Sequence, residues 1–272
     1  MYEILKTRRL APNVREYEIY APDVARHARA GQFIILRVDE RGERVPFTIC
    51  DYDREKGTIT ILVQEVGYTT MLMGGLSEGD SLCDFVGPLG RATDLKEYSN
   101  IVLVGGGIGT AVIYPQAKQL KSEGKAADVI VGARTKELIM YESEFKAAAR
   151  NLYLTTDDGS YVRKGFVTDV LKELIPEKKY DCVFAVGPMP MMKAVCAVTK
   201  EQGIKTVVSM NSIMVDGTGM CGGCRVSVGG KFRYACVDGP EFDGHEIDWD
   251  EAIARLKLYR EHEDNCRLRS KK

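Results

Sequence analysis

The pattern of apolar and polar positions divides the chain into three parts. Up to about residue 95, short runs alternate apolar and polar residues between turns rich in Gly, Pro and Asp, which is typical of β-strands. The expected strands lie at residues 17–21, 31–38, 46–53 and 57–66 and within 77–90. Short strands at even spacing indicate a small β-barrel.

From residue 98 to residue 210 the rhythm changes. Apolar runs now alternate with segments that have helical spacing. The runs begin at residues 101, 128, 151, 181 and 205, and the helical segments lie within 111–124, 141–150, 167–175 and 191–203. Five strands joined by four helical crossovers predict an α/β domain, a parallel sheet covered by helices.

The last part, from residue 211 onward, has few apolar runs. Residues 211–240 contain seven glycines and three cysteines, so this segment needs a staple, and a metal site would supply one. Residues 248–265 are expected to form a final amphipathic helix. The predicted domains are therefore 1–97, 98–210 and 211–272.

Composition excludes several classes of function. The chain has 272 residues with 38 Lys and Arg against 39 Asp and Glu, and it lacks the basic stripe of a nucleic-acid binder. No apolar run approaches the ~18 residues of a membrane span, so no membrane partner is expected. Eight cysteines without a signal-peptide core at the start predict a reducing location, the cytoplasm.

The three histidines, His27, His245 and His262, show no pattern with a Ser or Cys nucleophile. Acid–base chemistry therefore has few side chains to use, and no catalytic side chain is predicted. Hydride or electron transfer needs no such groups, because bound cofactors carry out that chemistry.

Two glycine-rich turns in the α/β part indicate a nucleotide site. "VLVGGGIGTA" (102–111) joins a buried strand to a helix, where glycines allow a pyrophosphate to approach the backbone N–H groups. A second turn, "AVGPMPMM" (185–192), follows another strand at the same end of the sheet. A tight turn without a ligand is the alternative for the first. The residues expected to contact the nucleotide are Gly105, Gly106, Gly107, Gly109, Thr110, Gly187, Pro188 and Met189.

Two stretches of the barrel part suit a flavin. In "RVPFTI" (44–49), the arginine can pair with a phosphate, and the Phe and Thr can lie along a flavin ring. "VGYTT" (66–70) adds a glycine turn and two hydroxyls for a pyrophosphate. The alternatives are an ordinary strand with an exposed arginine and a plain turn with a helix cap. The candidate residues are Arg44, Pro46, Phe47, Thr48, Gly67, Thr69 and Thr70.

The cysteines of the last part have the spacing of iron ligands. Cys221 and Cys224 form a C-x-x-C pair, and Cys236 follows after eleven residues. Plant-type [2Fe–2S] sites use C-x₄-C-x₂-C and a later cysteine, and Asp216 stands where the first cysteine would be. A carboxylate oxygen is a competent ligand to ferric iron. Two alternatives stay open: zinc bound by the same four residues, and completion of the site by a distant cysteine such as Cys266.

The order of these motifs resembles the ferredoxin–NADP reductase superfamily, in which the barrel binds FAD and the α/β domain binds a nicotinamide nucleotide. With the cysteine segment included, the chain resembles the electron-transfer subunit of dihydroorotate dehydrogenase. It resembles more closely the small flavin subunit of NADH-dependent ferredoxin:NADP oxidoreductase, the electron-bifurcating transhydrogenase also called sulfide dehydrogenase. That likeness spans essentially the whole chain. Its segments are "VGGGIGTAVIYPQAKQLK", "GARTKEL", "TTDDGS", "KGFVTD" and "ACVDGPEFDGHEIDWDE".

This chain departs from the superfamily at one point and shares a feature with the closer family at another. The superfamily pattern is Arg, any residue, aromatic, Ser or Thr, whereas Arg44 stands one place further from Phe47 and Thr48. Asp216 is shared with the closer family, while the dihydroorotate family has cysteine there. This difference favours the transhydrogenase interpretation.

The resemblance implies an electron-transfer flavoprotein. NADH would pass hydride to FAD, and electrons would then reach a [2Fe–2S] cluster. The implied partner is a larger subunit with a second FAD and [4Fe–4S] clusters, working with NADPH and ferredoxin. The alternatives are the dihydroorotate dehydrogenase subunit and, in another class, a redox sensor or zinc-stapled nucleotide-binding module without catalytic activity.

The choice between NADH and NADPH depends on two strand ends. Arg134 and Lys136 follow the second strand of the α/β part, where they would suit a 2′-phosphate. The superfamily usually holds that phosphate after the third strand with Ser and Arg. Here Asp157 and Asp158 occupy that place, where they would repel a phosphate and accept hydrogen bonds from ribose hydroxyls. We therefore expect NADH.

Overall fold

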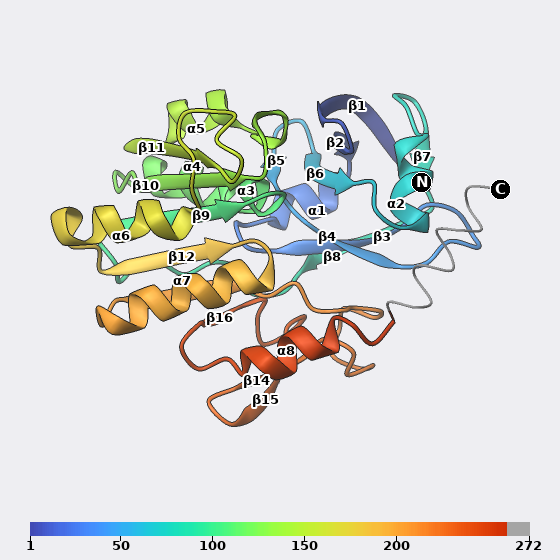
Figure 1. The fold of residues 1–272 in the computed structure, drawn as a ribbon. Helices are drawn as coiled ribbons and strands as arrows, with labels where there is room; N and C mark the ends of the chain where they lie inside the picture. The colour runs from blue at the N-terminus through green and yellow to red at the C-terminus, as the bar shows by residue number, and fades with distance from the viewer. Residues whose placement is uncertain (260–272) are drawn as a thin grey trace.

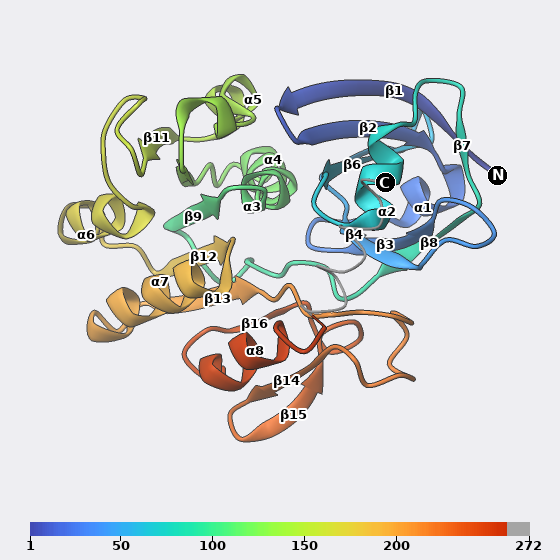
Figure 2. The ribbon, with the colours of Figure 1, turned by 45° about the vertical axis from the view of Figure 1, so that its right-hand side comes forward.

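The computed structural model describes residues 1–259, so the end of the expected helix at 248–265, with His262 and Cys266, lies outside the described residues. A β-barrel and an α/β domain stand side by side, and the C-terminal segment lies against both (Figures 1 and 2). The predicted fold class is confirmed by this arrangement.

The barrel is made of two sheets of antiparallel strands. One has the order β5-β6-β2-β1-β7 and the other β4-β3-β8. Their core contains the fully buried side chains of Tyr17, Ile34 and Ile61. The strands are β1 (Tyr2–Ala11), β2 (Val14–Tyr20), β3 (Phe33–Arg37), β4 (Val45–Thr48), β5 (Asp51–Asp53), β6 (Thr58–Gln64), β7 (Ser81–Leu82) and β8 (Asp84–Leu89), with helices α1 (Pro22–His27) and α2 (Tyr68–Gly74).

The α/β domain has the strand order β11-β10-β9-β12-β13, all parallel. The five predicted strands are all present, because buried parallel strands require near-continuous apolar runs. The strands are β9 (Ile101–Gly106), β10 (Asp128–Ala133), β11 (Asn151–Thr156), β12 (Cys182–Val186) and β13 (Lys205–Ser209). The helical segments between them are α3 (Gly109–Val112), α4 (Tyr114–Ser122), η1 (Lys136–Leu138), α5 (Glu142–Ala148), α6 (Val167–Lys178) and α7 (Met189–Glu201).

The first crossover differs from the single helix expected at 111–124. It is split into α3 and α4, and Pro115 occupies the first turn of α4. Proline has no N–H to donate and suits the first turn of a helix rather than its interior, so a new helix begins there.

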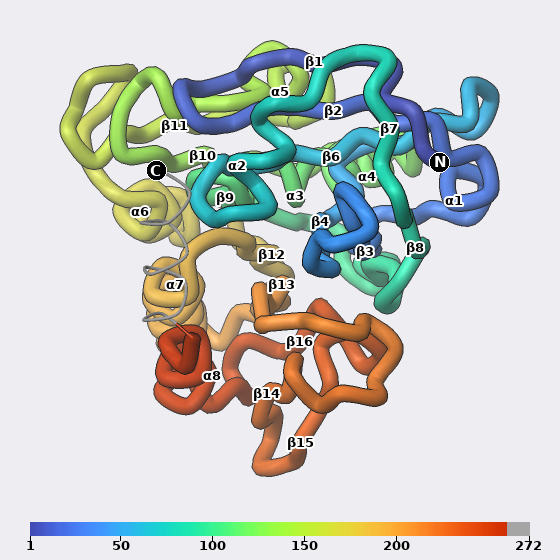
Figure 3. The backbone as a smooth tube through the Cα atoms, turned by 90° about the vertical axis from the view of Figure 1, so that its right-hand side faces the viewer, coloured from blue at the N-terminus to red at the C-terminus, as the bar shows by residue number. Residues whose placement is uncertain are grey.

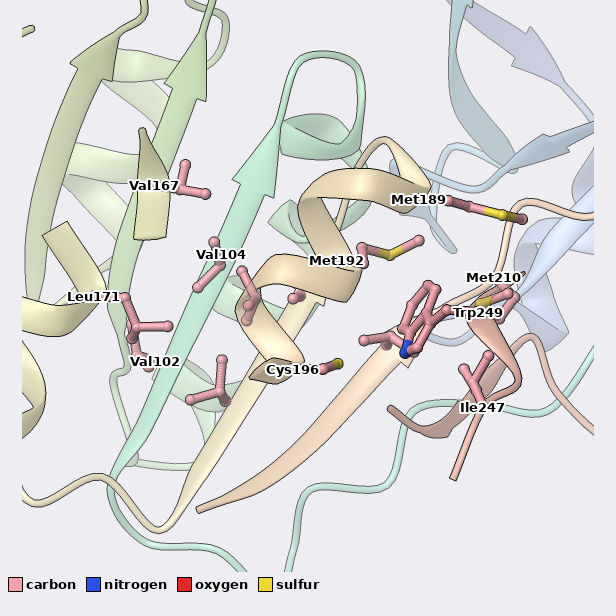
Figure 4. Close-up of a cluster of buried hydrophobic side chains, with 14 of the residues drawn as sticks. Val102, Val104, Val167, Leu171, Met189, Met192, Cys196, Met210, Ile247 and Trp249 are labelled. Atoms are coloured by element: carbon pink, nitrogen blue, oxygen red, sulfur yellow. The ribbon is translucent and has the colours of Figure 1, made fainter. Parts of the chain in front are cut away.

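The C-terminal segment is held by an apolar core as well as by its loops. It contains the hairpin β14 (Arg225–Val228) and β15 (Lys231–Tyr234), then β16 (Glu241–Asp243) and α8 (Trp249–Arg255). Strand β16 pairs antiparallel with β13 and extends the α/β sheet to six strands. Trp249 and Ile247 pack in one cluster with Met192 of α7 (Figure 4). Packing of apolar side chains therefore stabilises this segment in addition to a metal site.

Polar contacts join the barrel to the α/β domain. Lys118 of α4 lies 2.6 Å from Asp51 of β5, and the Tyr141 hydroxyl donates to Glu16 of β2 at 2.5 Å. The view in Figure 3, from the barrel side, shows the C-terminal segment below both of these parts. Within residues 1–259, no helix has the length and apolar character needed to cross a membrane.

Candidate functional site

The two glycine turns of the α/β domain face each other. Strands β9 and β12 are neighbours, and the order of the sheet reverses between them. A Cβ added at Gly109 would lie 2.4 Å from the carbonyl oxygen of Val186, so only glycine allows α3 to approach the end of β12. Ligands of open α/β sheets bind at this reversal, outside the carboxyl ends of the strands.

Gly107 lies at the open side of this site. Its φ is +55°, and its N–H donates to the Gly132 carbonyl at 2.9 Å. A Cβ added there would meet no atom of residues 1–259 within 4 Å, so the described chain leaves space for a ligand beside Gly107. The sequence expectation for this turn therefore has a geometric basis.

The other residues expected at this site have distinct surroundings. Gly105 and Gly106 end β9, and Thr110 is buried with its N–H donating to the Gly107 carbonyl. Pro188 caps α7, and Gly187 packs against Met191. The side chain of Met189 lies in the core near Met192 and Trp249 (Figure 4), so a nucleotide at this turn would meet its backbone.

Acidic and basic groups meet at the ends of β10 and β11. The Asp158 N–H donates to the Arg134 carbonyl at 3.2 Å, which places Arg134 beside both aspartates. Asp158 Oδ1 accepts from the N–H and hydroxyl of Ser160, and these bonds, the hydroxyl's first, lower the pKa of Asp158. Lys136 is engaged elsewhere, with its Nζ 5.0 Å from the Tyr161 ring centre. Within residues 1–259 the Arg134 guanidinium has no ion pair, and two carboxylates beside this single cation favour ribose hydroxyls over a 2′-phosphate.

The two flavin motifs of the barrel are brought together in space. Phe47 and Thr48 lie on β4 opposite Ile34 and Phe33 of β3. Glu43, just before this strand, accepts a hydrogen bond of 3.4 Å from Thr69 at the start of α2. The strand and the helix start therefore border the same side of the barrel.

The hydroxyl of Thr70 has a local partner already. Its Oγ1 accepts from the N–H groups of Val66 and Gly67 at 2.9 and 2.8 Å and donates to the Gly67 carbonyl. This is the helix cap that the sequence left as an alternative. Among the described residues, a Cβ at Gly67 would have Thr70 Oγ1 alone within 4 Å, so this part of the chain leaves the approach to the turn open.

The three cysteines gather around one loop. Cys224 and Cys236 are both 2% exposed, with their sulfurs 3.2 Å apart. Burial and the hydrogen bond with Cys224 raise the pKa of the Cys236 thiol to about 12. Cys221 is exposed, and its sulfur accepts from the Gly223 N–H at 3.4 Å, the first cause of its lowered pKa. Bound iron would hold all three as thiolates through its positive charge.

The two carboxylate oxygens of Asp216 differ in their hydrogen bonds. Its Oδ2 accepts from the hydroxyl of Thr218 at 2.5 Å, from the Thr218 N–H at 2.8 Å and from the Met220 N–H at 3.3 Å. These bonds, the hydroxyl's first, lower the pKa of Asp216, and the charge of Arg44 contributes. Asp216 Oδ1 has no hydrogen bond within the described chain, so this oxygen is available as a ligand.

The four candidate ligands lie close to one another. Cys224 contacts Cys236, and Cys221 is near enough to Asp216 and to Cys236 for charges to act between them. A [2Fe–2S] cluster takes two ligands at each of two irons. The contact pair Cys224–Cys236 with Cys221 and Asp216 nearby is compatible with such a cluster.

The loop with the candidate cluster ligands packs directly against the part of the barrel that carries the candidate flavin motif. Gly217 has φ +85°, and a Cβ there would lie 2.4 Å from Ile35 Cδ1 of β3. Arg44, just before β4, contributes through its charge to the lowered pKa of Asp216. Sequence reasoning did not find this proximity, because no local motif records a contact between residues so far apart in the chain.

Comparison with known proteins agrees with both candidate sites. Residues 211–248 match the family model of the iron–sulfur cluster binding domain of dihydroorotate dehydrogenase B, and residues 103–197 match the oxidoreductase NAD-binding domain. A protein of Thermotoga maritima described as a homolog of the electron transfer subunit of dihydroorotate dehydrogenase B (NAD⁺) is 47% identical over 261 residues, covering 96% of this chain and 92% of that protein. The electron transfer subunit of that enzyme from Fusobacterium nucleatum is 36% identical over 228 residues, covering 80% and 86%.

A solved structure matches even more completely. It is a chain of the NADH-dependent reduced ferredoxin-NADP oxidoreductase, determined to study flavin-based electron bifurcation. The chain is 45% identical to it with a TM-score of 0.95, covering 100% of this chain and 98% of that chain.

Fold, paired glycine turns and cysteine loop together define an NAD(P)H-dependent flavin and iron–sulfur oxidoreductase of the ferredoxin–NADP reductase type. Within that class, the chain belongs to the family of dihydroorotate dehydrogenase B electron-transfer subunits and their homologues. The family resemblance inferred from the sequence motifs is confirmed.

Proposed function

We propose that this chain is an electron-transfer flavoprotein subunit that moves electrons between NADH, FAD and a [2Fe–2S] cluster within an NADH-dependent ferredoxin:NADP oxidoreductase complex. The observation that carries the proposal is the contact between the cluster loop and the barrel, where a Cβ at Gly217 would lie 2.4 Å from Ile35 and the charge of Arg44 is near enough to contribute to the lowered pKa of Asp216. This contact brings the two candidate redox sites together. The full-length likeness to the oxidoreductase structure supports it.

Each part of the chain would bind and orient one group. The Gly107 turn would receive the pyrophosphate of the nucleotide, and Asp157 and Asp158 its ribose hydroxyls. Residues of β4 and the start of α2 would hold FAD, with Arg44 on its phosphates. When bound, the nucleotide, flavin and cluster supply hydride and electron transfer, and the protein supplies their positions.

The four cluster ligands would divide between the two irons as they pair in the fold. Cys224 and Cys236 would bind the buried iron, and Asp216 and Cys221 the iron nearer the surface. Backbone N–H groups of the loop already point at sulfur, as the Gly223 N–H does at Cys221. Such bonds tune the potential of a cluster.

A partner subunit is part of this proposal. Cys50 follows β4, Cys182 lies on β12 and Cys196 lies on α7, so these buried cysteines are on separate elements and are poor candidates for ligands of further clusters. The [4Fe–4S] clusters and second FAD of an oxidoreductase that works with NADPH and ferredoxin would then belong to a larger subunit. Thiolate ligands suit a compartment that keeps thiols reduced, such as the cytoplasm.

Spectroscopy and nucleotide kinetics of the purified chain test the proposal. We expect the absorption bands of both flavin and ferric–sulfide, iron and sulfide in a 2:2 ratio per chain, and faster reduction of an artificial acceptor with NADH than with NADPH. A faster reaction with NADPH would contradict the nucleotide assignment. A colourless protein, or coloured protein without diaphorase activity, would instead support the non-catalytic module.

A second candidate function is the electron-transfer subunit of dihydroorotate dehydrogenase. It is favoured by the family model at residues 211–248 and by relatives of that description. Isolation of the native complex distinguishes the two candidates. An orotate-forming flavoprotein in the complex would support dihydroorotate oxidation, and a subunit with FAD and [4Fe–4S] clusters would support the first proposal.

A further inference from the structure

The side chain of Glu241 lies where all three parts of the protein meet. Glu241 begins β16, at the edge of the α/β sheet. Its Oε1 is 2.5 Å from the hydroxyl of Thr93, in the connection between the barrel and the α/β domain. The amide of Gln116 on α4 lies 3.0 Å from the same hydroxyl, and Gly31 of the barrel closes the group. Three segments far apart in the sequence therefore surround the carboxyl group of Glu241.

Glycine at position 31 is required by this arrangement. Its φ is +85°, and a Cβ there would lie 2.3 Å from Thr93 Oγ1 and 2.4 Å from Glu241 Oε1. Both distances are far below any normal contact, so a side chain would push the carboxyl group away from the barrel. The fold is thus built to admit this carboxyl group at close range.

The hydrogen bonds that join Glu241, Thr93, Gln116 and Gly31 are all satisfied when the carboxyl group of Glu241 is neutral. With its amide oxygen turned inward, Gln116 accepts from the Thr93 hydroxyl at 3.0 Å and from the Gly31 N–H at 3.2 Å, and its amide nitrogen donates to the Val112 carbonyl. The Thr93 hydroxyl has one proton, and in this arrangement it donates that proton to Gln116. The 2.5 Å contact requires that Glu241 carry a proton and donate it to the Thr93 oxygen.

The charges around the site agree with this pattern. Burial raises the pKa of Glu241 to about 7. Its neighbours in the described part of the chain, Gly31, Thr93, Gln116 and the paired Ser209 of β13, are all uncharged. An ionised carboxylate would therefore have no cation to compensate it.

The segment that carries Glu241 also carries a cluster ligand. Cys236 lies five residues earlier, and two backbone bonds fasten the stretch between them. The Arg91 N–H donates to the Gly239 carbonyl at 2.7 Å, and the Met210 N–H donates to the Pro240 carbonyl at 2.9 Å. A shift of Glu241 would consequently move this stretch relative to the barrel.

We propose that Glu241 is a positioning residue: its neutral carboxyl group docks the cluster-bearing segment onto the barrel and the α/β domain, and its ionisation loosens that docking. The effect that this docking would have on electron transfer to the cluster rests on the proposed function. The docking part concerns the protein alone and can be measured without any cofactor reaction.

Two pH series on the full chain with its bound cofactors test the inference, each comparing the parent with Glu241→Gln. In the first, we expect the unfolding temperature of the parent to fall relative to the variant by a few degrees between about pH 5 and pH 8. The sign follows from the raised pKa: as pH rises, the unfolded chain ionises first, which favours unfolding of the parent. In the second, stopped-flow mixing with NADH follows the cluster bands, and cluster reduction in the parent should slow severalfold above about pH 7 relative to the variant.

The matched control is Glu246→Gln, an exposed carboxyl group on the same segment, which should keep the parent's profiles. Identical pH profiles for the parent and Glu241→Gln would overturn the inference. Should that variant fail to fold, infrared spectra of the parent decide: a protonated-carboxyl band that disappears near pH 7 supports the inference, and its absence refutes it. A preparation without flavin or cluster would contradict the proposed function, while the unfolding series would still decide the role of Glu241.

Discussion

Replacing Gly107 with alanine separates the structural role of the glycine turn from its role in nucleotide binding. Gly107 has φ +55°, where an L side chain is strained by about 1 kcal/mol. The added methyl group would contact no atom of the part of the chain that the structure describes, because none lies within 4 Å of its position. The loss of stability should therefore stay near that value, equivalent to roughly 2–4 °C in the unfolding temperature.

Nucleotide binding should suffer far more than stability. The free space at Gly107 lies beside the reversal of the sheet, where the pyrophosphate is expected, so the methyl group would displace it from the backbone N–H groups. Loss of one charge-assisted hydrogen bond costs about 1.5–3 kcal/mol, which is roughly a tenfold to hundredfold increase in KM for NADH. FAD content should not change.

The chain contains a matched control in Gly124, which follows α4. It has φ +75° and equally no neighbour within 4 Å of an added Cβ, but it lies away from the carboxyl ends of the strands. Thermal unfolding and steady-state kinetics with an artificial acceptor should show similar stability losses for Gly107→Ala and Gly124→Ala. Only Gly107→Ala should raise KM. Equal KM values for the two variants would refute a nucleotide-binding role for the turn.

Two further substitutions test the flavin and cluster assignments. Arg44→Ala should weaken FAD binding by about 1.5–3 kcal/mol through loss of a charge-assisted contact. Equilibrium dialysis measures the affinity for FAD, with Arg41→Ala as the control. If Arg44→Ala retains FAD as tightly as the parent, another residue binds the FAD phosphates. Asp216→Ala should make the cluster labile, whereas Asp216→Cys should keep it with a changed potential, as measured by iron and sulfide content and by electron paramagnetic resonance of the reduced protein. Parent-like content and spectrum in Asp216→Ala would mean that another residue is the fourth ligand, with Cys266 the next to test.

The α/β domain could be predicted from the sequence because its signals are local. Runs such as "IVLVGG" are buried on both faces, and the glycines after them mark the turns. Strand β1 was not predicted, because "YEILKTRRLA" has charged residues at many positions and only Ile4 and Ala11 are buried. The strand is defined by its pairing with β2 and β7, which no local pattern records.

The candidate sites show the same limit. Spacing alone identified the four proposed cluster ligands, since iron ligation imposes a fixed order on nearby residues. Spacing could not reveal that the charge of Arg44 acts on Asp216 or that Glu241 lies against Gly31, because these residues belong to segments that are distant in the chain. They depend on how the barrel, sheet and C-terminal segment pack.

The addition of β16 to the sheet also affects how the chain can be divided. Without β16, the edge of β13 would present unpaired N–H and C=O groups beside buried apolar residues such as Val208. Exposed strand edges of this kind recruit other chains and promote aggregation. A fragment that stops after β13 would thus be a template for intermolecular pairing rather than a minimal dehydrogenase. Through β16, the iron–sulfur segment pairs with the edge of the nucleotide-binding sheet and protects it from aggregation. The two are therefore expected to be inherited, expressed and engineered as one unit.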